Sequence, residues 1–149
     1  MLSVAARGPE TMTKIRGKLL LVDDDRDVRN ITVAALADAG ADITAVDSGP
    51  AALSLIERGT PFDMLIADYA MPSMNGAELI CRVRDRLPRL PVILVTGYAQ
   101  DALAHLPVDV VTVRKPFRTS EMLERVRAAL AGIAATQANV IPISVWRSQ

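Results

Sequence analysis

The stretch KLLLVDDDRDVRNITVAALADAGADITAV at residues 18–46 indicates the fold, because it reads as a strand, a helix and a second strand. The apolar run Leu19–Val22 stops abruptly at Asp23, which is typical of a buried strand. From Arg26 to Ala39 apolar residues recur at helical spacing, and a second apolar run follows at Ile43–Val46. This order is typical of a unit that feeds a parallel sheet.

The same alternation continues along the chain as far as Ala131. Three further apolar runs are predicted to be strands: Met64–Ala67, Val92–Val95 and Val108–Val113. A helix is predicted over Ser48–Gly59, and another passes through Leu79, Ile80 and Val83 and ends before Pro88. A short helix is expected within Gly97–Leu106, and the last one runs from Thr119 or Ser120 to Leu130. Regular alternation of strands and helices predicts an α/β protein with a parallel sheet.

Composition restricts the class of protein. The chain has 149 residues, half of them apolar, and 17 basic residues balance 17 acidic ones. This predicts one soluble domain and gives no electrostatic reason to expect DNA or a membrane as a partner. The single cysteine, Cys81, excludes an internal disulfide and a Cys/His metal site, which favours a cytoplasmic location. Cys81 lies among apolar neighbours, so we expect a buried, inert thiol.

The chain divides into three parts. Residues 1–17 are expected to be a flexible N-terminal arm, and residues 18–131 the folded domain. Residues 132–149 form a C-terminal tail that is too short for an output domain, and Pro142 argues against a membrane span there. The tail is open to three interpretations, namely a loose end, a strand that docks on the sheet, or a partner contact through Ile141, Ile143, Val145 and Trp146.

Polar residues stand where the predicted strands end: Asp23, Asp24, Asp68, Thr96 and Lys115. The carboxyl ends of parallel strands share one edge of a sheet, so these side chains are expected to converge. Three carboxylates with no His or Cys select a hard cation such as Mg²⁺. A lysine and a hydroxyl facing the same ion suit a phosphoryl group, and a carboxylate beside the ion can itself be the nucleophile.

The chain resembles the receiver domains of two-component response regulators in four blocks of sequence, LLLVDDD, LIADYAMPSMNGAEL, PVILVTGYA and VRKPF. The blocks occur in the family's order, each at the end of a predicted strand, and the resemblance covers about residues 18–131. It implies a doubly wound (βα)5 sheet of the flavodoxin-like type, with strand order 2-1-3-4-5 and helices on both faces.

The resemblance also implies a role for each residue at the strand ends. Asp68 matches the phosphoacceptor, and Thr96 and Lys115 match the groups that contact the phosphoryl group. The implied ligands of Mg²⁺, or of Mn²⁺ in its place, are Asp23, Asp24, Asp68 and the backbone carbonyl of Ala70. Pro116 matches a proline that follows a cis peptide bond in the family.

By the same resemblance, the chain takes a phosphoryl group from a phosphohistidine on a sensor histidine kinase or a histidine phosphotransfer protein. It then switches a downstream protein partner. It is not expected to be an enzyme beyond its own phosphorylation and dephosphorylation. The cognate kinase, the stimulus and the downstream target are not specified by the sequence.

The sequence departs from the family three residues before the lysine, where Thr112 replaces the usual Tyr or Phe. A β-branched threonine cannot swing in and out as a ring does. The interval from Thr96 to Lys115 is also shorter than is typical of the family. Both changes fall on the surface through which many family members dimerise, so we expect a monomer or a weak dimer with an atypical output.

Two alternative functions are weighed against this one. A pseudo-receiver would bind a protein partner without being phosphorylated, but the acidic set, Thr96 and Lys115 are all present. A haloacid-dehalogenase-type phosphatase also forms an aspartyl-phosphate. Asp23 and Asp25 begin the spacing of its motif, and Asp27 breaks it.

Overall fold

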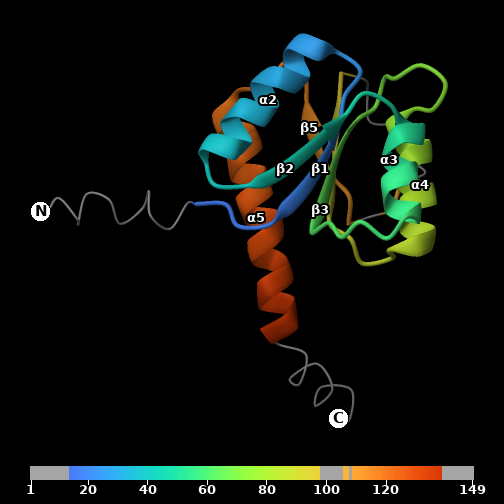
Figure 1. Cartoon of the computed structure of the whole chain (residues 1–149). Coiled ribbons are helices and arrows are strands. Elements are labelled where there is room, and N and C mark those ends of the chain that lie inside the picture. The colour runs from blue at the N-terminus through green and yellow to red at the C-terminus, as the bar shows by residue number, and fades with distance from the viewer. Residues whose placement is uncertain (1–13, 98–105, 108, 139–149) are drawn as a thin grey trace, which may run out of the picture.

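The computed structural model describes residues 14–97, 106–107 and 109–138 (Figure 1). Five strands form one sheet: β1 (Lys18–Val22), β2 (Asp42–Val46), β3 (Met64–Asp68), β4 (Val92–Thr96) and β5 (Val111–Arg114). All neighbouring strands are parallel, and their order is β2-β1-β3-β4-β5. The predicted fold class and strand order are therefore confirmed.

Helices cover both faces of the sheet, as expected (Figure 1). The described residues contain α2 (Arg26–Asp38), α3 (Gly49–Glu57), α4 (Gly76–Arg86) and α5 (Thr119–Ala138). Figure 1 shows α2 and α5 on one face and α3 and α4 on the other. Each face has its own apolar core, and β3 and β4 are buried along their whole length because they lie inside the sheet with helices on both sides.

Polar side chains fix where three of the helices begin. Asp25 accepts hydrogen bonds from the backbone N–H groups of Asp27 and Val28 at the start of α2. Ser48 and Asn75 cap α3 and α4 in the same way. An N-cap satisfies backbone donors that have no partner inside the helix. The caps of α2 and α4 follow closely after β1 and β3, so they also hold the loops that carry the strand-end aspartates.

The C-terminal part of the sheet differs from the sequence prediction. β5 begins at Val111 and not at Val108, because Pro107 and Val110 form a turn in which the Val110 N–H donates to the Pro107 carbonyl at 3.2 Å. α5 continues to Ala138, so it takes in the first residues of the expected tail. The added segment is rich in alanine, which has the highest helix propensity. Most of the short helix expected within Gly97–Leu106 lies outside the described residues.

Two other expectations also need correction. Ile15 belongs to the expected flexible arm, yet it is fully buried and its N–H donates to the carbonyl of Ala39. The last residues of the arm therefore pack against the domain. Cys81 is exposed and not buried, because the apolar face of α4 presents Leu79, Ile80 and Val83 to the core and turns Cys81 outward.

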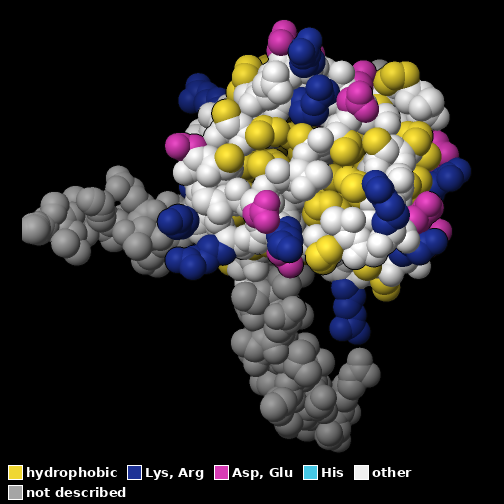
Figure 2. Space-filling model, viewed as in Figure 1, with side chains coloured by type: hydrophobic (Ala, Val, Ile, Leu, Met, Phe, Trp, Pro, Cys, Tyr) yellow, Lys and Arg dark blue, Asp and Glu magenta, His cyan; other side chains and the backbone are white. Residues whose placement is uncertain are grey.

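The surface agrees with the balanced charge of the sequence. On the face seen in Figure 2, basic and acidic side chains are interspersed with apolar ones, and no large area of one sign is visible. No helix in the described part of the chain is both long and apolar enough to cross a membrane.

A clamp around Arg84 holds the end of the sheet at which the strands begin. The Arg84 guanidinium donates to both carboxylate oxygens of Asp109, at 3.2 and 2.9 Å, and its Nε donates to the Leu90 carbonyl at 2.9 Å. The Arg84 side chain is only 12% exposed. The clamp joins α4, the start of β4 and the turn before β5.

Arg84→Ala is expected to destabilise the protein by about 1–2 kcal/mol, because three hydrogen bonds are lost and the Leu90 carbonyl loses its donor. Arg84 lowers the pKa of the Asp109 carboxyl, so the contribution of the ion pair is fully present above pH 3.8 and is lost as the pH falls below that value, through the lowered pKa of the folded state. Urea unfolding at neutral and acidic pH tests both statements.

The matched control is Arg82→Ala, which removes an exposed ion pair with Glu78 on the same helix. Exposed pairs of this kind contribute about 0.3–0.5 kcal/mol. If the two variants lost the same amount of stability, the contacts of Arg84 would stabilise the protein no more than an exposed ion pair does, and the prediction would be wrong.

Candidate functional site

The predicted site residues meet at the carboxyl-terminal edge of the sheet. Asp23 follows β1, Asp68 ends β3, Thr96 ends β4 and Lys115 follows β5. The parallel register sets Asp68 beside Val95, and Thr96 beside Arg114. Strands that are far apart in the sequence therefore bring these side chains to one place, as the sequence predicts.

Three carboxylates form the centre of the site. Asp23, Asp24 and Asp68 each offer an oxygen, and these oxygens lie within 4.8 Å of one another. Asp23 is only 5% exposed and Asp68 only 3%, whereas Asp24 is exposed. Carboxylates this close repel one another, and the repulsion is strong where water is excluded.

Lys115 partly neutralises this cluster. Its Nζ lies 2.8 Å from Asp68 Oδ1, and its side chain is about one third exposed. Asp68 Oδ1 is buried and accepts no hydrogen bond of good geometry among the described residues, so the lysine meets it as an ion pair. The Lys115 N–H donates to the Thr96 carbonyl at 2.9 Å, and the peptide bond to Pro116 is cis, as expected.

The titration of the site follows from this crowding. Burial is the main cause that raises the pKa of Asp23 and of Asp68, and neighbouring carboxylates add to the shift. The Lys115 ammonium opposes it at both groups. Burial alone would lower the pKa of Lys115, but the nearby carboxylates, Asp68 first, raise it above its usual range. The lysine is thus held in its charged form.

The loop after β1 is held by a residue that the sequence did not single out. Arg29 on α2 donates from Nη1 to the backbone carbonyl of Asp23 at 2.8 Å, and the Asp25 N–H donates to the Asp23 carboxylate at 2.9 Å. These bonds fix the main chain and the side chain of Asp23. An arginine on a helix gives no sequence signal for such a role, because the contact depends on how the helix packs.

The loop after β3 is held by apolar anchors. Met71 and Met74 are buried in the core, and the N–H of Gly76 donates to the Tyr69 carbonyl at 2.8 Å. A side chain at position 76 would meet the Asp68 carbonyl at 2.5 Å, so only glycine allows this close approach. Ala70 lies exposed in this loop, two residues after Asp68.

The donor set fits a hard cation. Its side-chain ligands are all carboxylate oxygens, and two of the three aspartates are buried with only one lysine ammonium within ion-pair distance of Asp68. Mg²⁺ and Mn²⁺ prefer such oxygen ligands, and a divalent ion would offset the repulsion within the cluster.

An apolar hollow adjoins the site. It has a volume of about 500 Å³ and lies between α2 and the segment after β5, and its lining comprises Asp25, Val28, Ile31, Thr32, Lys115, Pro116, Phe117 and Thr119. Ile31 is one of these lining residues, and its side chain is 59% exposed. The hollow therefore offers an apolar contact surface next to Lys115.

Comparisons of sequence and of structure with known proteins point to the same family. Residues 19–127 match the family model described as the response regulator receiver domain. The chain is 34% identical over 116 residues to the response regulator receiver protein CpdR of Brucella abortus, covering 76% of this chain and 96% of that protein. A CheY-like receiver domain protein from Methanospirillum hungatei superimposes with a TM-score of 0.73 at 26% identity, covering 79% and 96% of the two chains.

Other relatives are much longer than this chain. The response regulator protein FleR of Pseudomonas aeruginosa is 36% identical over 126 residues, covering 80% of this chain but only 26% of FleR. The likeness to FleR is thus confined to about a quarter of that protein.

The crowded carboxylates lead to a prediction about stability. Asp23→Asn removes one charge but keeps an oxygen for the Asp25 N–H. The raised pKa of Asp23 means that its ionised form is disfavoured in the folded state, so the wild type loses stability as the pH rises above 3.8. In EDTA at neutral pH the variant should therefore melt at a higher temperature than the wild type, and the difference should shrink as the pH falls below that value.

Adding Mg²⁺ should raise the melting temperature of the wild type and have little effect on Asp23→Asn, because binding to the folded state alone stabilises it. Asp38→Asn, which changes an exposed carboxylate at the end of α2, is the matched control and should respond to Mg²⁺ like the wild type. A variant that melts below the wild type in EDTA at neutral pH would contradict the electrostatic account.

Proposed function

The chain belongs to the family of response regulator receiver domains, and from this membership we propose that it is a phosphoacceptor that takes a phosphoryl group onto Asp68. The observation that carries the proposal is the meeting of a buried Asp68, a Lys115 ammonium 2.8 Å away and two further carboxylates at one edge of the sheet.

The proposed reaction uses Asp68 as the nucleophile. A carboxylate oxygen attacks the phosphorus of a phosphohistidine, an oxygen–phosphorus bond forms, and the phosphorus–nitrogen bond to the histidine breaks. Lys115 contacts the phosphoryl oxygens with its positive charge, and the Thr96 hydroxyl donates a hydrogen bond to them. Water later hydrolyses the acyl phosphate, which restores the Asp68 carboxylate and releases phosphate. On this proposal the chain catalyses no reaction on other substrates.

A divalent cation completes the proposed site. Asp23, Asp24, Asp68 and the carbonyl of Ala70 are the proposed ligands, with Mg²⁺ favoured and Mn²⁺ as a substitute. The cation would offset negative charge on the phosphoryl oxygens during transfer. The chain's own contribution is to orient Asp23 through Arg29 and the Asp25 N–H, and to hold Lys115 in its charged form.

The proposed phosphodonor is a sensor histidine kinase or a histidine phosphotransfer protein. A donor must bring its phosphohistidine to Asp68, so it must contact the surface around the site. The apolar hollow with the exposed Ile31 adjoins Lys115 and supports contact with a protein there. The downstream target is proposed to be a protein, and neither DNA nor a membrane is proposed as a partner.

Phosphorylation is tested by the intact mass of the chain after incubation with Mg²⁺ and acetyl phosphate. The wild type should gain the mass of one phosphoryl group, and Asp68→Ala should gain none, because the nucleophile is lost. Asp85→Ala, which removes an exposed carboxylate on α4, is the matched control and should be labelled like the wild type.

A known receiver domain labelled in parallel shows that the reagent is active. If it is labelled and the wild type is not, the chain is a pseudo-receiver and the proposal fails. Sustained release of phosphate from small phosphate esters would instead support the phosphatase alternative.

Thr112 leads to a prediction about assembly. It lies on β5, where the family usually carries an aromatic residue. Without a ring that can move with Thr96, we expect the chain to stay a monomer or a weak dimer when beryllofluoride mimics the phosphoryl group. Sedimentation of the wild type and of Thr112→Tyr, with and without beryllofluoride, tests this. A tight dimer of the wild type that forms only with the mimic would contradict the prediction.

A further inference from the structure

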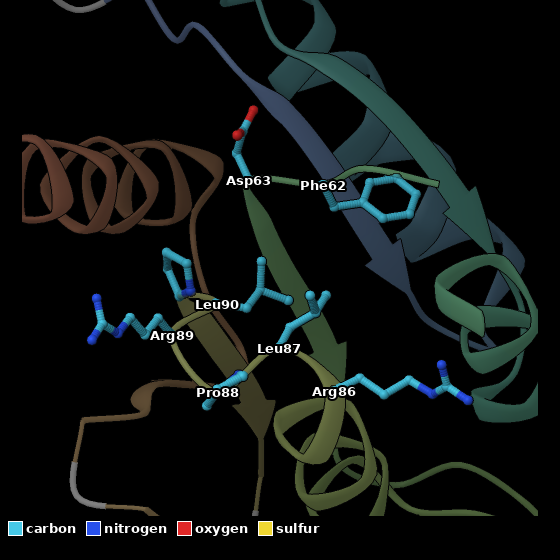
Figure 3. Close-up of a pocket in the computed structure, with 8 residues that line it drawn as sticks. Phe62, Asp63, Arg86, Leu87, Pro88, Arg89 and Leu90 are labelled. Atoms are coloured by element: carbon cyan, nitrogen blue, oxygen red, sulfur yellow. The ribbon is translucent and has the colours of Figure 1, made fainter. Parts of the chain in front are cut away.

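A second groove lies at the opposite end of the sheet from the phosphoacceptor site. It has a volume of about 390 Å³ and lies where β3 and β4 begin, between the residues before β3 and the loop that joins α4 to β4 (Figure 3). Its apolar lining consists of Phe62, Leu87, Pro88, Leu90 and Pro91, and its charged residues are Asp63, Arg86 and Arg89. A groove of this volume can hold several side chains.

The guanidinium groups of the two arginines in the groove have no polar partner among the described residues. Among the described residues the side chains of Arg86 and Arg89 take part in no hydrogen bond or ion pair, and Figure 3 shows them extending to opposite sides of the pocket. Asp63, by contrast, accepts a hydrogen bond from the Lys18 N–H at 2.8 Å. The groove therefore has an apolar lining flanked by two unpaired guanidinium groups. A segment with apolar side chains would fill this lining, and an aromatic ring in it could also stack on a guanidinium group.

The sequence after α5 has this composition. Residues 139–149 read NVIPISVWRSQ and contain one formal charge, Arg147. Their large apolar side chains are Val140, Ile141, Ile143, Val145 and Trp146. Leaving so many apolar side chains in water is unfavourable, so a surface that buries them would be occupied. Tryptophan is also the best aromatic partner for an arginine.

The geometry allows this segment to reach the groove. α5 ends at Ala138, and Figure 1 shows its C-terminal half at the same end of the molecule as the loop between α4 and β4. Fully extended, the eleven residues 139–149 would span at most roughly 36 Å.

We propose that residues 139–149 fold back into the groove formed by Phe62, Leu87 and Leu90, with Trp146 packed between this apolar lining and Arg86 or Arg89. The segment then covers the end of the sheet at which the strands begin. The phosphoacceptor edge at the opposite end stays open. The proposal is independent of whether Asp68 is phosphorylated.

Trp146 reports directly on this contact, because it is the only tryptophan in the chain. We would measure its emission maximum and its quenching by acrylamide in the full chain and in a free peptide of residues 139–149. A docked tryptophan should emit at shorter wavelength and be quenched less than in the peptide.

The groove variant is Phe62→Ser combined with Arg86→Ser and Arg89→Ser. Both arginines are exposed, whereas Phe62 is half-buried and packs against the apolar core, so the fold of the variant is checked separately. Losing the contact with one large apolar side chain should lower the ratio of docked to free segment about tenfold. The Trp146 emission should therefore move towards that of the peptide. Circular dichroism confirms that the variant is folded, and a second variant with only the two arginine changes should give a smaller shift.

The matched control is Ile31→Ser, which removes the exposed apolar side chain from the hollow beside Lys115 and should leave Trp146 unchanged. The proposal is overturned if Trp146 in the wild type behaves as it does in the peptide. It is equally overturned if Ile31→Ser shifts the emission and the groove variant does not. A shift that appears only as the protein concentration rises would assign the groove to the segment of a second copy, and would also overturn it.

Discussion

The contact between Lys115 and Asp68 is the interaction on which the functional edge of this protein depends. Asp68 is buried beside two other carboxylates, an arrangement that is unfavourable without positive charge nearby. Only the sheet can bring Lys115 within 2.8 Å of it, because the lysine follows β5 while the carboxylates follow β1 and β3. The strand order, the glycine at position 76 and the bonds that hold Asp23 all serve to keep this cluster in place.

The two ends of the sheet carry different kinds of interaction. At the carboxyl-terminal edge, charges are crowded and their pKa values are raised, so the site is electrostatically strained and suited to bind a cation or a phosphoryl group. At the opposite end, Arg84 satisfies its donors on Asp109 and Leu90 and ties α4 to the turn before β5. The Arg84 contacts thus hold the fold together at a distance from the phosphoacceptor edge.

Membership of the receiver family accounts for the site but not for every feature of the chain. The site does not involve Thr112 on β5 or the groove around Leu87 and Leu90, and the exposed Ile31 lies in the hollow beside Lys115. None of these residues belongs to the acidic cluster. These features bear on how the chain could contact other segments and proteins, and not on the proposed chemistry at Asp68.

The sequence by itself determined the five strands, the α/β class and the convergence of Asp23, Asp24, Asp68, Thr96 and Lys115. These features follow from local patterns, because apolar runs and the polar residues that end them are read within a few positions. Only the tertiary structure decided that β5 starts at Val111, that Ile15 is buried, that Cys81 is exposed and that Arg29 holds Asp23. Each of these depends on how elements pack, as when Arg84 pairs with Asp109 across 25 positions of sequence. Residue periodicity carries no information about such contacts, since it specifies which face of an element is apolar but not what that face meets.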